Sequence, residues 1–205
     1  MKTNEIYVSN QGAGREEALN ETEKYADYQG LDHKAKMHIR ILAEEMLGMV
    51  AAIAGNFYAY YWIEDDSEGY HLHLEARVEM NATKRDALID ASTSKRNSSA
   101  RGVMGKLRDV FQNYWMGYKE TIIYPSNNYD YMSYGIIDPG IYSSPAIWSL
   151  SQYQTVVRKD EGASETWDEL EKSIIANIAD DVTVGIKGDN VEMVITKRWK
   201  KANNK

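Results

Sequence analysis

The residues with the clearest chemical potential form a polar, basic segment that runs into a predicted helix. Serine hydroxyls and cations fill much of positions 92–101, and two glycines follow at the helix start. Free backbone N–H groups at a helix N-terminus attract anions, and glycine lets a ligand approach the backbone closely. A solvated loop with a serine cap explains much of the same composition and stays open as an alternative. The predicted phosphate-binding residues are Ser99, Arg101, Gly102, Gly105 and Lys106.

Two adjacent carboxylates, Glu44 and Glu45, stand in a segment whose apolar residues recur every three or four positions. That period is typical of an amphipathic helix, here predicted over residues 32–54. On such a helix Glu44 lies roughly opposite the apolar stripe, and Glu45 flanks it. A carboxylate at the edge of a buried face can orient a water molecule, which makes Glu44 a candidate catalytic group. The alternative is that both are ordinary solvated side chains, as adjacent glutamates usually are.

Metal and nucleophile chemistry find little support in the sequence. His71 and His73 share one face of a predicted strand, a spacing that can chelate a metal, but no third ligand is identifiable beside them. Cysteine is absent, which excludes disulfides, thiol nucleophiles and thiolate metal sites. No Ser/His/Asp arrangement or nucleophile elbow is evident. We therefore predict no metal site.

Composition limits the class of protein and its partners. The 205 residues carry a formal net charge of -7, with a pI of about 5.2, and their number fits one domain. An acidic chain lacks the basic face that nucleic-acid phosphates require, so nucleic acid is not an expected partner. No apolar run approaches membrane-spanning length, and residues 1–5 lack the apolar core of a secretion signal. The expected location is the cytoplasm.

The segments that must position these residues show helical periodicity in some places and strand periodicity in others. This combination predicts an α+β fold, and we expect a single domain over residues 1–205. We expect a two-layer sandwich, with the helices packed on one face of a mixed, mostly antiparallel sheet. Residues 1–30 are predicted as an N-terminal leader, loose over 1–14 and then helical, and the Tyr- and Pro-rich residues 125–153 as an ordered insertion. The predicted helices cover 16–29, 32–54, 83–90, 102–118 and 165–179, and the predicted strands 57–64, 70–80, 121–124, 153–158, 182–186 and 191–195.

The order of these elements resembles the histidine-kinase-like ATPase superfamily, the Bergerat-fold (GHKL) group that includes anti-sigma-factor serine kinases and gyrase B. The shared order is a helix with a Glu, two strands, a variable loop, a glycine-bearing helix start and a closing strand pair. Glu44 matches the Glu of the family's Glu-x-x-x-Asn box, but Gly48 stands where the Asn should be. Residues 101–106 resemble the late glycine box, whereas the Asp-x-Gly-x-Gly box is missing after Val78.

The resemblance implies an ATP-binding regulatory domain, similar to the small serine kinases that act on sigma factors. It implies that Glu44 orients water or acts as a base, and that the backbone at Gly102 and Gly105 holds the phosphates. Glu45 and Gly48 belong to the predicted nucleotide-binding residues. Because Gly48 offers no magnesium ligand, and the carboxylate of Glu45 leaves the helix in another direction, we expect weak magnesium binding and slow or absent ATP turnover. The alternative is a catalytically inactive module of the same fold that binds a protein or small ligand through residues 125–153. A homodimer also stays open.

Overall fold

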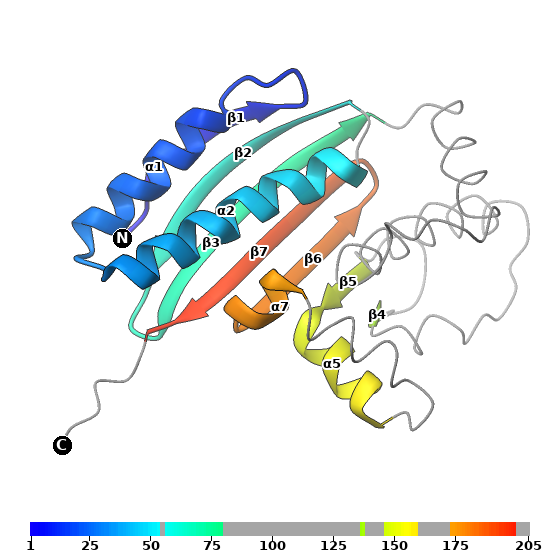
Figure 1. Cartoon of the computed structure of the whole chain (residues 1–205). Coiled ribbons are helices and arrows are strands. Elements are labelled where there is room, and N and C mark those ends of the chain that lie inside the picture. The colour runs from blue at the N-terminus through cyan, green and yellow to red at the C-terminus, as the bar shows by residue number, and fades with distance from the viewer. Residues whose placement is uncertain (54–55, 80–135, 138–145, 160–172, 200–205) are drawn as a thin grey trace, which may run out of the picture.

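The computed structural model describes residues 1–53, 56–79, 136–137, 146–159 and 173–199. Its strands form one sheet with helices on one side (Figure 1). The sheet has seven strands in the order β1-β2-β3-β7-β6-β5-β4. These strands are β1 (Ile6–Ser9), β2 (Asn56–Asp65), β3 (Gly69–Glu79), β4 (Ile136–Ile137), β5 (Ala146–Ser149), β6 (Asp181–Lys187) and β7 (Asn190–Arg198). The described helices are α1 (Arg15–Tyr28), α2 (His33–Ile53), α5 (Leu150–Lys159) and α7 (Ile174–Ile178).

Two hairpins make the centre of the sheet. β2 pairs with β3, and β6 pairs with β7 across a tight turn. β7 also pairs with β3, so the closing hairpin of the chain lies beside the earlier one. Every pairing between described strands is antiparallel, whereas the sequence pattern predicts a mixed sheet. Between β1 and β2 the reason is the connection, because two successive helices reverse the chain once more than the single crossover helix of a parallel pair.

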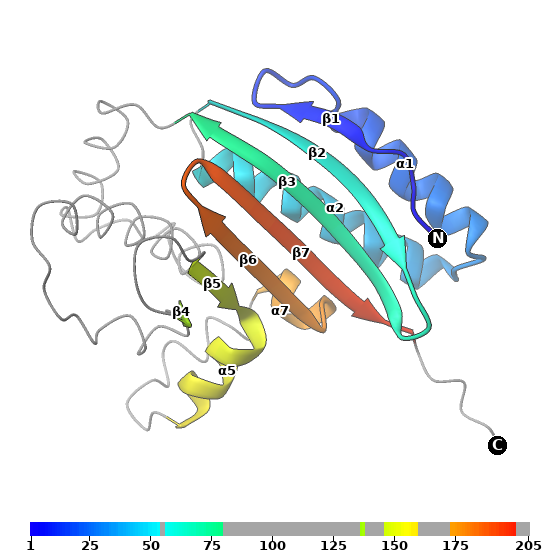
Figure 2. The same ribbon diagram turned by 180° about the vertical axis from the view of Figure 1, so that it is seen from behind.

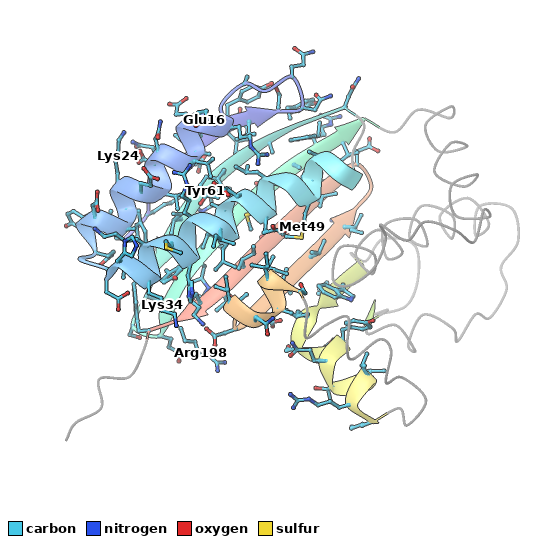
Figure 3. All side chains as sticks on the ribbon, in the orientation of Figure 1. Glu16, Lys24, Lys34, Met49, Tyr61 and Arg198 are labelled. Atoms are coloured by element: carbon cyan, nitrogen blue, oxygen red, sulfur yellow. The ribbon has the colours of Figure 1, made fainter. Side chains whose placement is uncertain are left out.

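The core lies between the helices and one face of the sheet. α1, α2 and α7 lie on the same face, and Figure 2 shows that no described helix covers the other face of the central strands. We call that other face the outer face. Figure 3 shows Tyr61 of β2 and Met49 of α2 in the layer between helices and sheet. The strand and helix residues buried there alternate on β2 and recur with helical spacing on α2: Phe57, Ala59, Tyr61, Ile63, Ile39, Leu42, Met46 and Met49.

Carboxylates fix the positions at which two helices begin. Asp32 Oδ1 accepts a hydrogen bond of 2.7 Å from the backbone N–H of Ala35 in the first turn of α2. Asp32 thus caps the N-terminus of α2, a position at which aspartate is strongly preferred. Asp181, at the start of β6, accepts a 3.0 Å hydrogen bond from the backbone N–H of Ser151 and so caps α5 from another element.

Most of the predicted elements within the described residues are confirmed. The helix predicted over 32–54 is α2, and it packs in the core as expected. The strands predicted over 57–64 and 70–80 are β2 and β3, and those predicted over 182–186 and 191–195 are β6 and β7. Each of these two pairs forms an antiparallel hairpin. α1 confirms the helix predicted over 16–29. The helix predicted over 165–179 is not continuous, because Ser173 has an extended backbone and caps α7, which begins only at Ile174. The elements predicted over 83–90, 102–118 and 121–124 lie outside the described residues.

The prediction of a loose leader is wrong for residues 6–9. Ile6 and Val8 are buried, and the segment pairs with β2 as the edge strand of the sheet. Two alternating apolar residues in an otherwise polar run are a weak signal, and pairing with a long neighbouring strand is enough to order them.

The prediction of a strand over 153–158 is also wrong. These residues belong to α5, whose buried residues are Leu150, Tyr153 and Val157. The β-branched Thr155 and Val156 favour a strand by intrinsic propensity. The spacing of the buried residues is helical, and packing of that stripe outweighs the propensity.

The turn that follows β1 covers the outer edge of that strand. The backbone N–H of Ser9 donates a 3.1 Å hydrogen bond to the carbonyl of Ala13. Gly14 adopts φ +75° and lies against the carbonyl of Tyr7, so a Cβ at this position would collide with that carbonyl. Position 14 therefore requires glycine both for its backbone conformation and for the close approach.

Candidate functional site

Ion pairs connect one flank of helix α2 with α1. Lys36 Nζ pairs with the carboxylate of Asp27, and the guanidinium of Arg40 pairs with Glu23. The hydrogen bond to Glu23 raises the pKa of Arg40 above its ordinary value. The flank of α2 that carries Lys36 and Arg40 therefore faces α1.

Glu44, the predicted catalytic carboxylate, belongs to this ion-pair network. Arg40 Nε donates a hydrogen bond of 3.1 Å to Glu44 Oε1, and the Glu44 side chain is 42% exposed. One guanidinium thus joins Glu44 and Glu23 on the surface of the helical layer. Exposed pairs of this kind contribute little to stability. The described contacts of Glu44 are those of a surface helix residue with a cationic partner.

Glu45 lies on the other side of α2, and Gly48 lies between the directions of Glu44 and Glu45, on the side of the helix that is turned away from the sheet. Glu45 follows Lys36 by nine residues, about two and a half helical turns, so the two side chains leave the helix in opposite directions. Because Lys36 faces α1, Glu45 faces the side on which α7 lies beside α2 (Figure 1). Gly48 follows about one turn later, and no described atom lies within 4 Å of the position that a Cβ would take. Among the described residues, the surface of α2 at Gly48 is therefore open.

The predicted phosphate-binding residues lie outside the described residues. β3 ends at Glu79, which is paired with Asn56 at the start of β2, and α2 ends at Ile53 just before that strand. The chain therefore leaves β3 toward the predicted segment at the end of the sheet where α2 also ends. The residues concerned are Ser99, Arg101, Gly102, Gly105 and Lys106.

A second group of interacting side chains, which sequence reasoning missed, lies on the outer face of the sheet. Trp62 of β2 and His73 of β3 are directly opposite, and their rings stack with centroids 5.0 Å apart and an interplanar angle of 3°. Lys2 Nζ lies 4.6 Å from the centroid of the Trp62 ring. The indole N–H of Trp62 donates to Glu64 Oε1 at 3.0 Å. The face thus combines ring surface, a cation and a carboxylate.

The two histidines of β3 have different surroundings on this face. His71 Nδ1 lies 3.1 Å from Thr196 Oγ1, and His71 Nε2 lies 3.3 Å from Asp66 Oδ2. His73 Nε2 lies 3.9 Å from Glu64 Oε2, and burial lowers the pKa of His73 from its ordinary value of 6.5. In the part of the chain that the structure describes, no group of three or more His, Asp or Glu residues is arranged to hold a metal ion.

Comparison of the chain with protein-family models, with curated proteins and with solved structures finds no match. None of the described helices is long and apolar enough to cross a bilayer. Function is therefore inferred from the two regions themselves, the surface of α2 at Glu45 and Gly48 and the outer face of the sheet.

Proposed function

We propose that the chain is an ATP-binding domain of the histidine-kinase-like (Bergerat) type with a regulatory role, and that ATP lies against the flank of α2 that carries Glu45 and Gly48. Two observations carry the proposal: Glu45 is turned away from α1, and no described atom lies within 4 Å of the position of a Cβ at Gly48. The order of elements also supports it. The β2–β3 hairpin follows α2, and the closing β6–β7 hairpin lies beside β3 in the same sheet.

In this proposal the predicted polar segment supplies the phosphate contacts. The triphosphate meets backbone N–H groups at Gly102 and Gly105, with Arg101 and Lys106 as countercharges and Ser99 as a hydroxyl donor. These contacts use the backbone and point charges, which bind any phosphate. Specificity for the nucleotide then depends on the pocket wall that α2 forms.

The residues of α2 favour ATP binding without efficient ATP turnover. Phosphoryl transfer relies on a metal ion that neutralises charge on the phosphate oxygens. The resembled family holds magnesium with an Asn at the position of Gly48, and glycine has no side chain to offer as a ligand. Glu44 is not free to act as a base while Arg40 holds its carboxylate. The residues of α2 do not fit a metal site of the family type, and we assign nucleotide binding alone to the chain.

A second candidate is a catalytically inactive interaction module of the same fold. The pairing of Glu44 with Arg40 and the glycine at position 48 favour it, because neither residue is then available for nucleotide chemistry. Such a module binds a protein partner without ATP, through residues 125–153 or through another surface. The two candidates differ in one measurable property, which is nucleotide binding by the folded chain.

Titration of the purified chain with a fluorescent ATP analogue, with and without magnesium, tests the proposal. Gly48→Phe fills the open space beside α2, so we expect it to weaken binding at least about tenfold with no loss of melting temperature. Met37→Phe is the matched control, since Met37 is exposed on the same helix, about three turns before Gly48. Gly102→Val tests the phosphate segment and should also weaken binding, because a side chain blocks the approach to the backbone.

Two results would contradict parts of the proposal. Folded wild-type protein that does not bind the analogue would exclude ATP binding and leave the interaction module. Binding of unchanged affinity in both Gly48→Phe and Gly102→Val would show that the nucleotide lies elsewhere and would overturn the assigned pocket.

A further inference from the structure

The outer face of the sheet carries a row of side chains that crosses four strands. Tyr7, Tyr60, Glu75 and Glu192 are in register on β1, β2, β3 and β7. Figure 2 looks onto this face, and no described helix lies over these strands. The row therefore lies on a broad strand surface that the described helices leave accessible.

The tyrosines in and beside this row are unusually exposed for large aromatic residues. Tyr7 is 50% exposed, Tyr60 48% and Tyr58 37%. The rings of Tyr7 and Tyr60 meet edge to face, with centroids 6.0 Å apart, so the two form one continuous patch. Tyrosine combines an apolar ring with a polar hydroxyl and is enriched in protein interfaces. The patch is of the kind that a protein partner covers.

The carboxylates next to this patch indicate the charge of that partner. Glu75 and Glu192 are directly opposite each other on β3 and β7, and both are exposed. Like charges opposite each other on neighbouring strands are destabilising. Neither carboxylate forms an ion pair with another described residue, and this includes Arg77, which is the next residue of β3 on the same face. A cation supplied from outside the chain would relieve the repulsion.

Two further features of the same face suit the approach of a cationic segment. Gly185 of β6 is paired with Glu192, and no described atom lies within 4 Å of the position of a Cβ, so the surface beside Glu192 is flat and open. Glycine inside a strand often marks a place where another backbone approaches. Lys2 already lies over the Trp62 ring on this face, which shows that an aromatic ring here accepts a cation.

We propose that the outer face of the sheet docks a basic segment of a protein partner, whose Arg or Lys side chains lie against Tyr60 and pair with Glu75 and Glu192. A nucleic acid is the wrong ligand for this row, because its phosphates would be repelled by both carboxylates. A second copy of the chain packed through the same row would add two more carboxylates to the pair. The proposal does not depend on ATP binding, since the row lies on the opposite side of the sheet from α2.

Binding of two labelled decapeptides, one alternating Arg with Val and one alternating Glu with Val, tests this proposal by fluorescence anisotropy. We expect the basic peptide alone to bind, and its affinity to fall with added salt. The double variant Glu75→Lys/Glu192→Lys should bind it at least about tenfold more weakly. Tyr60→Ala should also weaken binding, because it removes the ring against which the cation lies.

The matched control is Glu16→Lys/Glu17→Lys, which changes the net charge by the same amount on α1, across the sheet from the row (Figure 3). It should bind the basic peptide as the wild type does. Equal loss in the two double variants would show a nonspecific charge effect and overturn the proposal, as would a folded wild type that does not bind the basic peptide. A concentration-dependent dimer in sedimentation that Tyr60→Ala abolishes would assign the face to a second copy instead.

Discussion

The hydroxyl of Tyr61 lies 2.7 Å from the hydroxyl of Thr22, and both side chains are buried between α1 and the sheet. Thr22 has one hydroxyl hydrogen, and it donates that hydrogen to the carbonyl of Ala18 at 2.8 Å. The Tyr61 hydroxyl must therefore be the donor in the bond between the two side chains. Burial raises the pKa of Tyr61, so the phenol keeps its hydrogen at any physiological pH. This hydrogen bond therefore connects α1 to β2.

The direction of this bond predicts unequal costs for removing its two ends. Tyr61→Phe removes a donor and leaves Thr22 bonded to Ala18, so we expect a loss of about 1 kcal/mol in the free energy of unfolding. Thr22→Val leaves the buried Tyr61 hydroxyl without an acceptor and should cost about 1–3 kcal/mol. Urea unfolding of both variants and of the double variant measures these costs. Equal costs in the two single variants, or a larger cost for Tyr61→Phe, would contradict the assigned direction.

Gly14 should be far less tolerant of substitution than Gly12, although both have positive φ. Gly14→Ala adds backbone strain of about 1–2 kcal/mol and also drives a methyl group into the Tyr7 carbonyl. Gly12→Ala meets no described atom and is expected to cost only the backbone strain. Thermal unfolding of the two variants compares them directly. Equal melting temperatures would show that β1 does not depend on the close approach at Gly14.

Stability should fall on mild acidification because of His73. Burial lowers its pKa below 6.5, so the unfolded chain binds the proton more readily than the folded chain. The contribution of His73 is thus complete above about pH 6.5 and is lost as the pH falls toward the lower pKa of the folded state. His73→Phe keeps a ring against Trp62 and should flatten the fall in unfolding free energy between about pH 7 and pH 5. His33→Gln, at the exposed start of α2, is the control and should leave the slope unchanged.

ATP turnover by the wild-type chain should be slow or absent, and Gly48→Asn alone should not make it fast. No described atom lies within 4 Å of the position of a Cβ at Gly48, and thermal unfolding of Gly48→Asn checks that the variant is folded. The chain still lacks the Asp-x-Gly-x-Gly box after Val78. Gly48→Ala serves as the control and should stabilise α2 by about 0.5–1 kcal/mol, measured by urea unfolding. Robust magnesium-dependent hydrolysis by the wild type, lost in Glu44→Ala, would contradict this expectation.

The fold was predictable where periodicity is long and local. The alternation of Leu72, Leu74 and Val78 predicts β3, and the polar turn before it predicts the hairpin. That Trp62 and His73 lie directly opposite each other was harder to predict, because it depends on the register between β2 and β3. Asp66 fixes that register locally by accepting the backbone N–H groups of residues 68 and 69 at 2.7 and 3.0 Å. The sequence contains this Asp-based turn, but the cross-strand pairs follow from it only once the number of turn residues is known.

The candidate site shows a different limit of sequence reasoning. A helical wheel places Glu44 opposite the apolar stripe and Glu45 beside it, and the structure agrees with that placement. The wheel does not say which flank of the helix meets a neighbouring helix. That choice depends on how α1 and α2 pack together, and the ion pairs of Lys36 and Arg40 mark the flank that meets α1. The flank of α2 at Glu45, which does not meet α1, could therefore be recognised only with α1 in place.

The turn after β1 limits how this protein can associate with itself. An uncovered edge strand presents unpaired N–H and C=O groups on which another chain can add a strand, and repeated addition leads to fibrils. Here the N–H of Ser9 donates a hydrogen bond to the carbonyl of Ala13, and Gly14 lies against the carbonyl of Tyr7. Sheet extension on this side is blocked by a few residues of the chain itself. A substitution that displaces this turn should therefore endanger solubility before it affects any binding surface.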